Sequence, residues 1–274
     1  MSEFLSWTPD DAAAHISVPG DSDDKYTRGV LGVITGSAQY PGAAVLGVEA
    51  ALRTGVGMVR YIGPRRPTDL VLQRRPEAVA SMGRVQAWLI GSGMDAATRN
   101  RKTREYMAEA MSQGVPVVLD GGAFDLHDSA TGPVVITPHF RELARVIGRD
   151  VDTIAADPAE AAVRAAETLG VTVLLKGSTT YVASPEGTRL SVTSATPWLA
   201  TAGAGDALGG ILGALVATHA AGITDDPALL ARLAATAAVI HGLSARRASA
   251  EGPLTILDLA AEVPSTIAAL LRLR

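Results

Sequence analysis

The chain has 274 residues and a formal net charge of −4 at pH 7, with no cysteine and no run of lysines and arginines. The missing cysteines exclude disulfides, zinc–thiolate sites, iron–sulfur clusters and thiol nucleophiles, and the charge argues against nucleic acid or a membrane as a partner. Apolar residues make up 47% of the chain and aromatic residues 4%, a composition that suits helices packed closely on a buried parallel sheet.

The N-terminal stretch, MSEFLSWTPDDAAAH, has no basic flank followed by an apolar core. We therefore expect no secretory signal and a cytoplasmic protein. Short β-rich runs then alternate with longer helical patterns, and this alternation predicts a doubly wound parallel sheet. The runs cover 29–35, 57–62, 87–91, 115–120, 134–137 and 171–176, and the crossover helices 43–53, 98–113, 142–147 and 158–169.

The pattern changes after residue 176. Residues 179–184 and 188–193 are typical of two short strands around a Pro/Gly turn, a hairpin that we expect to close one edge of the sheet. From Ala204 onward the pattern is helical, and its most apolar run, 211–216, is far shorter than the ~20 residues of a membrane span. No long polar linker or repeat interrupts the sequence, so we expect one domain over residues 1–274.

Ligands of α/β sheets bind beyond the carboxyl ends of the strands, so the loops there are the first candidates for chemistry. The run TAGAGDALGGILGALVA has apolar residues at helical spacing, which predicts a helix that begins near Ala204. Gly203 and Gly205 allow close approach of a ligand, and the helix N-terminus favours an anion such as phosphate. Asp206, in the first turn, is either a catalytic base or a residue that caps the helix. A cap of this kind stabilises a helix by about 1 kcal/mol.

Three further polar residues follow predicted strands. Lys176, before the small loop GSTT, either holds phosphate oxygens or extends into solvent. Asp120, before two glycines, either faces a ligand or forms a turn. His139, in TPHFRE, either contacts a ligand or lies at a helix start, where Thr137 would supply a capping box.

Six motifs, taken in chain order, resemble those of one family. They are GSAQYPGAAVLGVEAALRTGVGMV, IGSGM, VVLDGGAFDL, ITPHFRELARVIG, LLKGSTTYVA and TAGAGDALGGILGAL. Over about residues 30–217 the sequence resembles the ADP/ATP-dependent NAD(P)H-hydrate dehydratases of the ribokinase-like superfamily. The resemblance implies an α/β fold of three layers, α/β/α, with a doubly wound, mostly parallel central sheet and helices on both faces.

The family repairs the hydrated S-form of NADH or NADPH: a nucleotide phosphorylates the ring hydroxyl, and loss of phosphate restores the double bond. By this resemblance Asp206 accepts the hydroxyl proton, and the amides around Gly203 and Gly205 stabilise the transferred phosphoryl group. The residues implied in nucleotide binding are Lys176, Gly177, Ser178, Thr179, Thr180 and Gly205. The residues implied in binding the hydrated dinucleotide are Ala43, Gly93, Asp95, Asp120, His139 and Asp206.

The resemblance also implies ADP or ATP as cosubstrate and Mg²⁺ bridging phosphate oxygens, with metal ligands that the sequence does not identify. It implies a homo-oligomer, a tetramer by family analogy. The chain is too short to add the epimerase domain of many relatives, so we expect a separate NAD(P)H-hydrate epimerase or spontaneous epimerisation.

Several positions depart from the family's usual pattern. Phe140 and Arg141 stand between His139 and Glu142, Asp95 adds a carboxylate to the GSGMD loop, and Thr179 replaces a frequent glycine. Two alternatives therefore stay open: a small-molecule alcohol kinase of the same superfamily, of the thiazole or pyrimidine type, and a non-catalytic adenine-nucleotide sensor.

Overall fold

A computed structural model describes residues 3–274, and within them the strands form one nine-stranded sheet in the order β1-β9-β8-β7-β6-β5-β4-β2-β3. Strand β8 alone runs antiparallel to its neighbours among these strands. The strands are β1 (Leu5–Ser6), β2 (Val30–Ile34), β3 (Met58–Tyr61), β4 (Ala87–Ile90), β5 (Val117–Leu119), β6 (Val134–Ile136), β7 (Thr172–Leu175), β8 (Thr180–Ala183) and β9 (Arg189–Val192).

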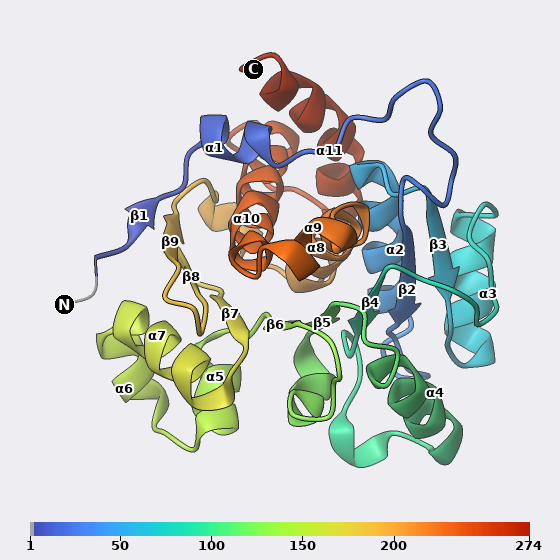
Figure 1. Ribbon diagram of the computed structural model, residues 1–274, viewed down its shortest axis with the longest axis horizontal. Helices are drawn as coiled ribbons and strands as arrows, with labels where there is room; N and C mark the ends of the chain where they lie inside the picture. The colour runs from blue at the N-terminus through green and yellow to red at the C-terminus, as the bar shows by residue number, and fades with distance from the viewer. Residues whose placement is uncertain (1–2) are drawn as a thin grey trace.

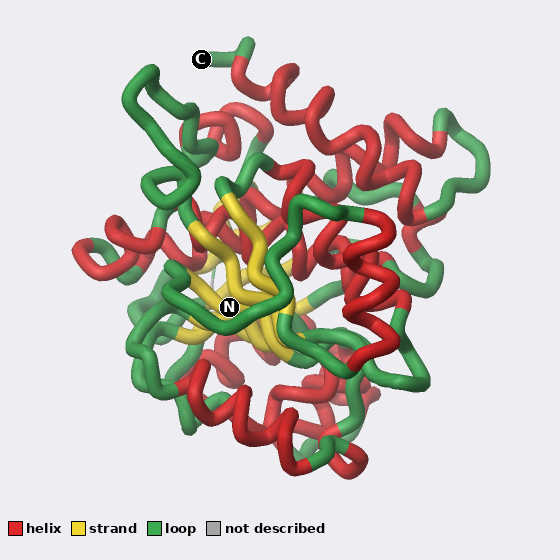
Figure 2. Tube along the Cα trace, turned by 90° about the vertical axis from the view of Figure 1, so that its right-hand side faces the viewer, coloured by secondary structure: helices red, strands yellow, loops and turns green. Residues whose placement is uncertain are grey.

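Helices cover both faces of this sheet. They are α1 (Pro9–Ala14), α2 (Gly42–Thr54), α3 (Arg65–Arg74), α4 (Arg101–Met111), α5 (Phe140–Ile147), α6 (Val151–Ala156), α7 (Pro158–Leu169), α8 (Ala204–Thr218), α9 (Ala220–Asp225), α10 (Ala228–Ser249) and α11 (Ile256–Leu271). Three short 3₁₀ turns complete the set: η1 (Ala96–Thr98), η2 (Gly121–Leu126) and η3 (Pro197–Leu199). Figures 1 and 2 show the strands enclosed between two helical layers.

Two apolar cores lie on the two faces of the sheet. Successive side chains of a strand point to opposite faces, so Leu31 and Val33 of β2 join one core, whereas Val30 and Ile34 join the other. The first core is completed by α2, α8 and α10, the second by α4, α5 and α7. Strands covered on both faces need continuous apolar runs, and the three-layer α/β/α prediction is confirmed.

Two expectations about this architecture need correction. The β8–β9 hairpin does not close the sheet, because β1 pairs in parallel with β9 outside it, Leu5 opposite Leu190. Helix α3 lies outside the helices expected from the sequence, since its apolar pattern is weak and it buries only Pro67 and Val71. Both elements are short or partly buried, so hydrophobic periodicity marks them poorly.

Helix α10 is a second long apolar helix, which the sequence reasoning did not single out. Among the described residues it is the one helix that could cross a membrane by length and composition, and 78% of its apolar window is buried inside the protein. The helix packs on strands β6 to β9 and on α8 and α11. Its burial is that of a core helix.

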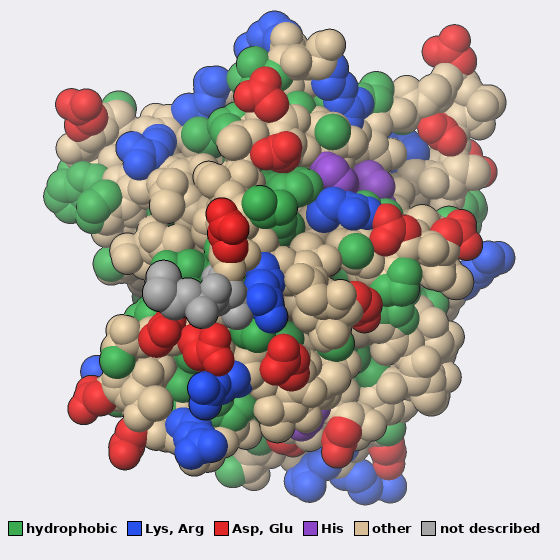
Figure 3. Space-filling model, turned by 60° about the vertical axis from the view of Figure 1, so that its left-hand side comes forward, with side chains coloured by type: hydrophobic (Ala, Val, Ile, Leu, Met, Phe, Trp, Pro, Cys, Tyr) green, Lys and Arg blue, Asp and Glu red, His purple; other side chains and the backbone are tan. Residues whose placement is uncertain are grey.

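On the face drawn in Figure 3, basic and acidic side chains are interspersed.

Candidate active site

The N-terminus of α8 lies at the carboxyl edge of the sheet. The helix begins at Ala204, as the sequence predicts, and its N-cap, Gly203, has a φ of +93°, a conformation that glycine adopts without strain. No side chain among residues 3–274 caps this end. The amides of the first turn are therefore available to an anion.

Close packing of two helices sets the position of this turn. Helix α8 runs against α2, and Gly210 lies so near the Gly47 carbonyl that a side chain there would collide with it. An added Cβ at Gly47 would in turn lie 3.5 Å from the Asp206 carbonyl oxygen. The glycines therefore bring the start of α2 and the start of α8 to one place.

Asp206 occupies the first turn of α8 and is mostly buried. Burial and, to a lesser extent, the Asp120 carboxylate raise the pKa of Asp206 to about 7, although the Lys176 ammonium opposes the rise. A carboxylate whose pKa lies near neutrality can accept a proton from a bound hydroxyl and release it again.

Asp120 and Lys176 form a buried ion pair beside Asp206. Asp120 follows β5 and Lys176 follows β7, and Nζ lies 3.0 Å from Oδ1. The hydroxyls of Ser92 and Thr137 also donate to the Asp120 carboxylate, at 2.9 and 2.7 Å. Burial disfavours both charges, but each partner stabilises the other: the pKa of Asp120 is lowered and that of Lys176 is raised. Lys176 therefore does not extend freely into solvent.

His139 and Glu142 extend this polar cluster. His139 is the N-cap of α5: its Nδ1 accepts from the Glu142 amide at 3.2 Å, and Glu142 accepts from the His139 amide at 2.8 Å. The capping residue is thus His139 and not Thr137, whose hydroxyl is engaged by Asp120. Glu142 Oε2 also lies 3.9 Å from Lys176 Nζ.

The loop of residues 176–179 joins β7 to β8 and faces the start of α8. An added Cβ at Gly205 would lie 3.3 Å from Lys176 Nζ, so the two segments are in contact. Gly177 and Ser178 are exposed. A Cβ at Gly177 would lie 3.2 Å from the ring of Phe140, one of the residues that depart from the family's usual pattern. The structure thus brings the predicted nucleotide loop to the predicted anion site.

The residues predicted to bind the dinucleotide lie on the neighbouring loops. Gly93 has a φ of +66°, and its Cα faces the methyl group of Ala43, with no room for a side chain between them. Asp95 caps the turn η1. A cavity of about 570 Å³ lies beside them, with Asp95 and Glu142 in its wall.

Comparison with known proteins agrees with this geometry. A family model described as NAD(P)H-hydrate dehydratase matches residues 31–266. This chain belongs to the NAD(P)H-hydrate dehydratase family.

Three relatives of the dehydratase family show how far the similarity extends. The bifunctional NAD(P)H-hydrate repair enzyme Nnr of Mycobacterium tuberculosis is 39% identical over 79% of this chain and 47% of its own length. The ADP-dependent (S)-NAD(P)H-hydrate dehydratase of Xanthomonas campestris is 31% identical over 73% of this chain and 76% of its own. The ADP/ATP-dependent NAD(P)H-hydrate dehydratase of Bacillus subtilis, co-crystallized with ATP/Mg²⁺, superposes with a TM-score of 0.86 at 25% identity, covering 98% of this chain and 100% of that one.

This chain spans about half the length of the bifunctional dehydratase relatives that it matches. A hydroxyethylthiazole kinase from Pyrococcus horikoshii superposes with a TM-score of 0.62 at 17% identity, which shows a shared fold.

Sequence reasoning missed several residues of the candidate site. Tyr40 and Arg145 line the cavity of about 570 Å³, and the hydroxyls of Ser92 and Thr137 donate hydrogen bonds to Asp120. Tyr40 could have been found, since it stands in the matched YPGAA motif, is aromatic, and is 53% exposed. The two hydroxyls could not, because their partner lies 28 and 17 residues away in sequence.

His241 is a further missed residue near the candidate site. It lies on α10, 8% exposed, beside the Ala204 backbone, and its Nε2 has no hydrogen-bond partner among residues 3–274. Burial lowers the pKa of His241 to about 4, so the ring is neutral at pH 7.

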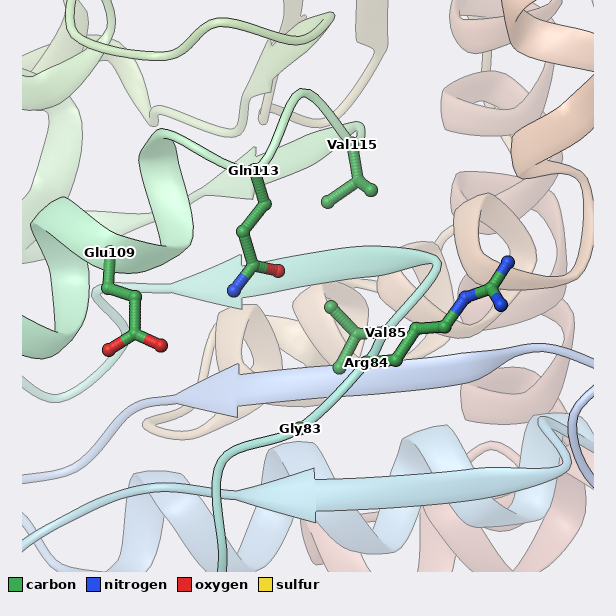
Figure 4. Close-up of a pocket in the computed structure, with 6 residues that line it drawn as sticks. All are labelled: Gly83, Arg84, Val85, Glu109, Gln113 and Val115. Carbon is green, nitrogen blue, oxygen red and sulfur yellow. The ribbon is translucent and has the colours of Figure 1, made fainter.

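Another hollow, of about 410 Å³, lies at the opposite edge of the sheet (Figure 4). Arg84, Val85 and Val115 in its wall precede strands β4 and β5. It is therefore remote from the carboxyl ends where the polar cluster lies, and where α/β sheets bind their ligands.

Proposed function

We propose that this chain dehydrates the S-form of hydrated NADH or NADPH in a reaction that consumes ADP or ATP. Support comes from family membership and from one observation above the others. A carboxylate with a pKa near 7, Asp206, stands in the first turn of a helix without a side-chain cap, beside the buried Lys176–Asp120 pair. This arrangement supplies a proton acceptor, and backbone N–H groups that can donate hydrogen bonds to an anion, within one turn of helix.

In the proposed reaction Asp206 accepts the proton of the ring hydroxyl as the hydroxyl oxygen attacks the terminal phosphoryl group of the nucleotide. The phosphoanhydride bond to that group breaks, and AMP leaves from ADP, or ADP from ATP. The amides near Gly203 and Gly205 stabilise the charge on that group. The carbon–oxygen bond then breaks, phosphate leaves, and loss of a ring proton restores the double bond. Phosphorylation converts a poor leaving group into a good one.

We assign the nucleotide to the loop between β7 and β8. Its phosphates would lie against Lys176, Gly177, Ser178, Thr179, Thr180 and Gly205. The hydrated dinucleotide would contact Ala43, Gly93, Asp95, Asp120 and His139. Lys176 stays protonated and can bind phosphate, because the neighbouring carboxylates raise its pKa in spite of burial.

Mg²⁺ would enter this site with the nucleotide. No group of three or more His, Asp or Glu side chains in the described part of the chain could hold a metal ion. Mg²⁺ does not require such a group, because it commonly binds through substrate phosphates, water and one or two carboxylates. Glu142, 3.9 Å from Lys176 Nζ, is the carboxylate that we assign to this role. The ion would neutralise charge between phosphate oxygens.

We further propose a cytoplasmic homo-oligomer, a tetramer by family resemblance, that works with NAD(P)H-hydrate epimerase activity. The matched relatives named bifunctional repair enzymes are about twice as long as the aligned part of this chain. An epimerase would supply the S-form from the other epimer.

The test is recovery of reduced-nicotinamide absorbance, together with phosphate release, from hydrated NADH with Mg²⁺ and ADP or ATP. We expect recovery only with nucleotide, and a loss of about 10²- to 10⁴-fold in Asp206→Asn. Asp152→Asn, an exposed aspartate in the first turn of α6, is the matched control and should retain activity. Nucleotide binding without recovery, with a stable phosphorylated product from a small alcohol, would instead establish a kinase.

A further inference from the structure

A second cavity, of about 220 Å³, lies beyond the carboxyl ends of β2 and β3. Its floor is apolar and aromatic, with Ile34, Ile62 and Tyr106. Two cations, Arg65 and Lys102, stand in its wall. The cavity thus combines a surface for a flat ring with donors for an anion.

The two cations are available to a ligand. The Arg65 side chain is 94% exposed, and its contact with Asp69, at 3.6 Å, is an exposed ion pair that contributes little. Lys102 is exposed, and its Nζ lies 5.5 Å from the centroid of the Tyr106 ring. Both side chains can therefore turn toward a phosphate without breaking a buried contact.

The two cavities at this edge differ in charge. The larger one, of about 570 Å³, has the carboxylates of Asp95, Asp125 and Glu142 in its wall against one arginine. The smaller one has two cations and, among the described residues that line it, no carboxylate. Met94 lines both, so they adjoin. A phosphate would be repelled by the larger cavity and attracted by the smaller one.

The distance between Asp120 and the smaller cavity suits the two ends of one dinucleotide. Asp120 follows β5, and the smaller cavity lies over β2 and β3. In the order β5-β4-β2-β3, strand β3 lies three strand spacings from β5, about 14 Å. A ligand whose reactive ring lies near Asp206 could therefore place its far end in the smaller cavity.

We propose that the smaller cavity binds the adenosine 2′-phosphate end of hydrated NADPH, with the purine on its apolar floor and the 2′-phosphate between Arg65 and Lys102. This inference rests on the proposed dehydratase function and assigns its substrate preference. Hydrated NADH, which carries a hydroxyl in place of the phosphate, would lose these two charged contacts.

The test compares KM for the two hydrates in Arg65→Ser, Lys102→Ser and the double variant. A charged hydrogen bond to phosphate corresponds to a roughly tenfold change in affinity, so each single variant should raise KM for hydrated NADPH about tenfold. KM for hydrated NADH and kcat for both substrates should stay unchanged. Arg101→Ser is the matched control, since Arg101 precedes Lys102, is 91% exposed and pairs with Glu105.

Equal changes in KM for both hydrates, or no change for either, would overturn the proposal. A binding readout separates its failure from failure of the dehydratase function. Titration with adenosine 2′-phosphate should show binding to the unmodified chain and loss of binding in the double variant, with adenosine alone binding weakly to both. If the unmodified chain does not bind adenosine 2′-phosphate, the assignment fails, whatever the dehydratase assay shows.

Discussion

Asp206 illustrates how a single residue can lower the stability of a fold while serving its site. A carboxylate that caps a helix stabilises it, and the pKa of such a group falls. The pKa of Asp206 is instead raised to about 7, because burial and the Asp120 carboxylate disfavour its charge. The two interpretations that the sequence leaves open therefore predict opposite effects on the free energy of unfolding.

We expect Asp206→Asn to raise the melting temperature at pH 8. The folded-state pKa lies above the ordinary value of 3.8, so folding disfavours the carboxylate increasingly as the pH rises from 3.8 to about 7, and fully above that. The neutral amide removes this penalty. Calorimetry from pH 4 to pH 8 measures the difference, which should shrink toward pH 4. A lower melting temperature than the unmodified protein at pH 8 would instead identify a stabilising cap.

The loop that enters α8 depends on one backbone conformation. Gly203 has a φ of +93°, and an added Cβ would lie 2.5 Å from Leu46 Cδ1 on α2. A side chain would therefore strain the backbone and also force the Leu46 side chain to move. Gly187, in the β8–β9 turn, has nearly the same φ, +95°, and no atom of the described residues lies within 4 Å of an added Cβ. A comparison of variants at the two glycines therefore separates the cost of backbone strain from the cost of the steric contact with Leu46.

Gly203→Ala should cost more stability than Gly187→Ala. Backbone strain in this region costs about 1–3 kcal/mol, a cost common to both variants, and the contact with Leu46 adds to it only at position 203. Gly203→Ala should also weaken ADP binding in the presence of Mg²⁺, whereas Gly187→Ala should not. Urea unfolding and ADP titration measure the two effects. Equal loss of stability would show that the α2 contact relaxes freely.

Helix α3 is attached to α2 through one buried carboxylate. Glu49 of α2 is fully buried and pairs with Arg53 of its own helix and with Arg74 and Arg75 of α3. Burial alone would raise the pKa of Glu49, but the three guanidinium groups lower it to about 2. This cluster compensates for the weak apolar face of α3.

We expect Glu49→Gln to lower the free energy of unfolding at pH 7 by about 3–5 kcal/mol, as when one partner of a buried pair is removed. The folded-state pKa lies below the ordinary value of 4.5, so the contribution of Glu49 is present above pH 4.5 and is lost as the pH falls toward 2. Urea unfolding at several pH values should show the two proteins converging in acid. Glu105→Gln, in the exposed pair with Arg101, should cost under about 1 kcal/mol.

At the scale of the whole molecule, the sequence predicts the interior of the sheet better than its rim. The parallel strands β2 to β7 stand where apolar runs predict them; five of them lie inside the sheet, and β3, though at the edge opposite β1, is also largely buried. Strand β1 has two exposed residues and lies at the edge, so no pattern marks it. A single domain over residues 1–274 stays a prediction.

The site follows the same division. Strand ends predict which loops meet, and Asp120, Lys176 and Asp206 do lie together. Contacts between loops depend on side-chain reach and register, which no local pattern encodes. The hydroxyl of Thr137 on Asp120, and the place of His241 behind Ala204, are of this kind.

The reversed direction of β8 has a consequence for the loop of residues 176–179. A crossover helix after β7 would have carried the chain away from the carboxyl edge. Because β8 turns back at once, the loop is held at both ends by ladder hydrogen bonds, with Leu175 opposite Tyr181 and Thr180 opposite Val192. A segment restrained in this way has little conformational freedom left to lose when a ligand binds. The antiparallel strand therefore fixes the conformation of the loop to which we assign the nucleotide phosphates, before any ligand arrives.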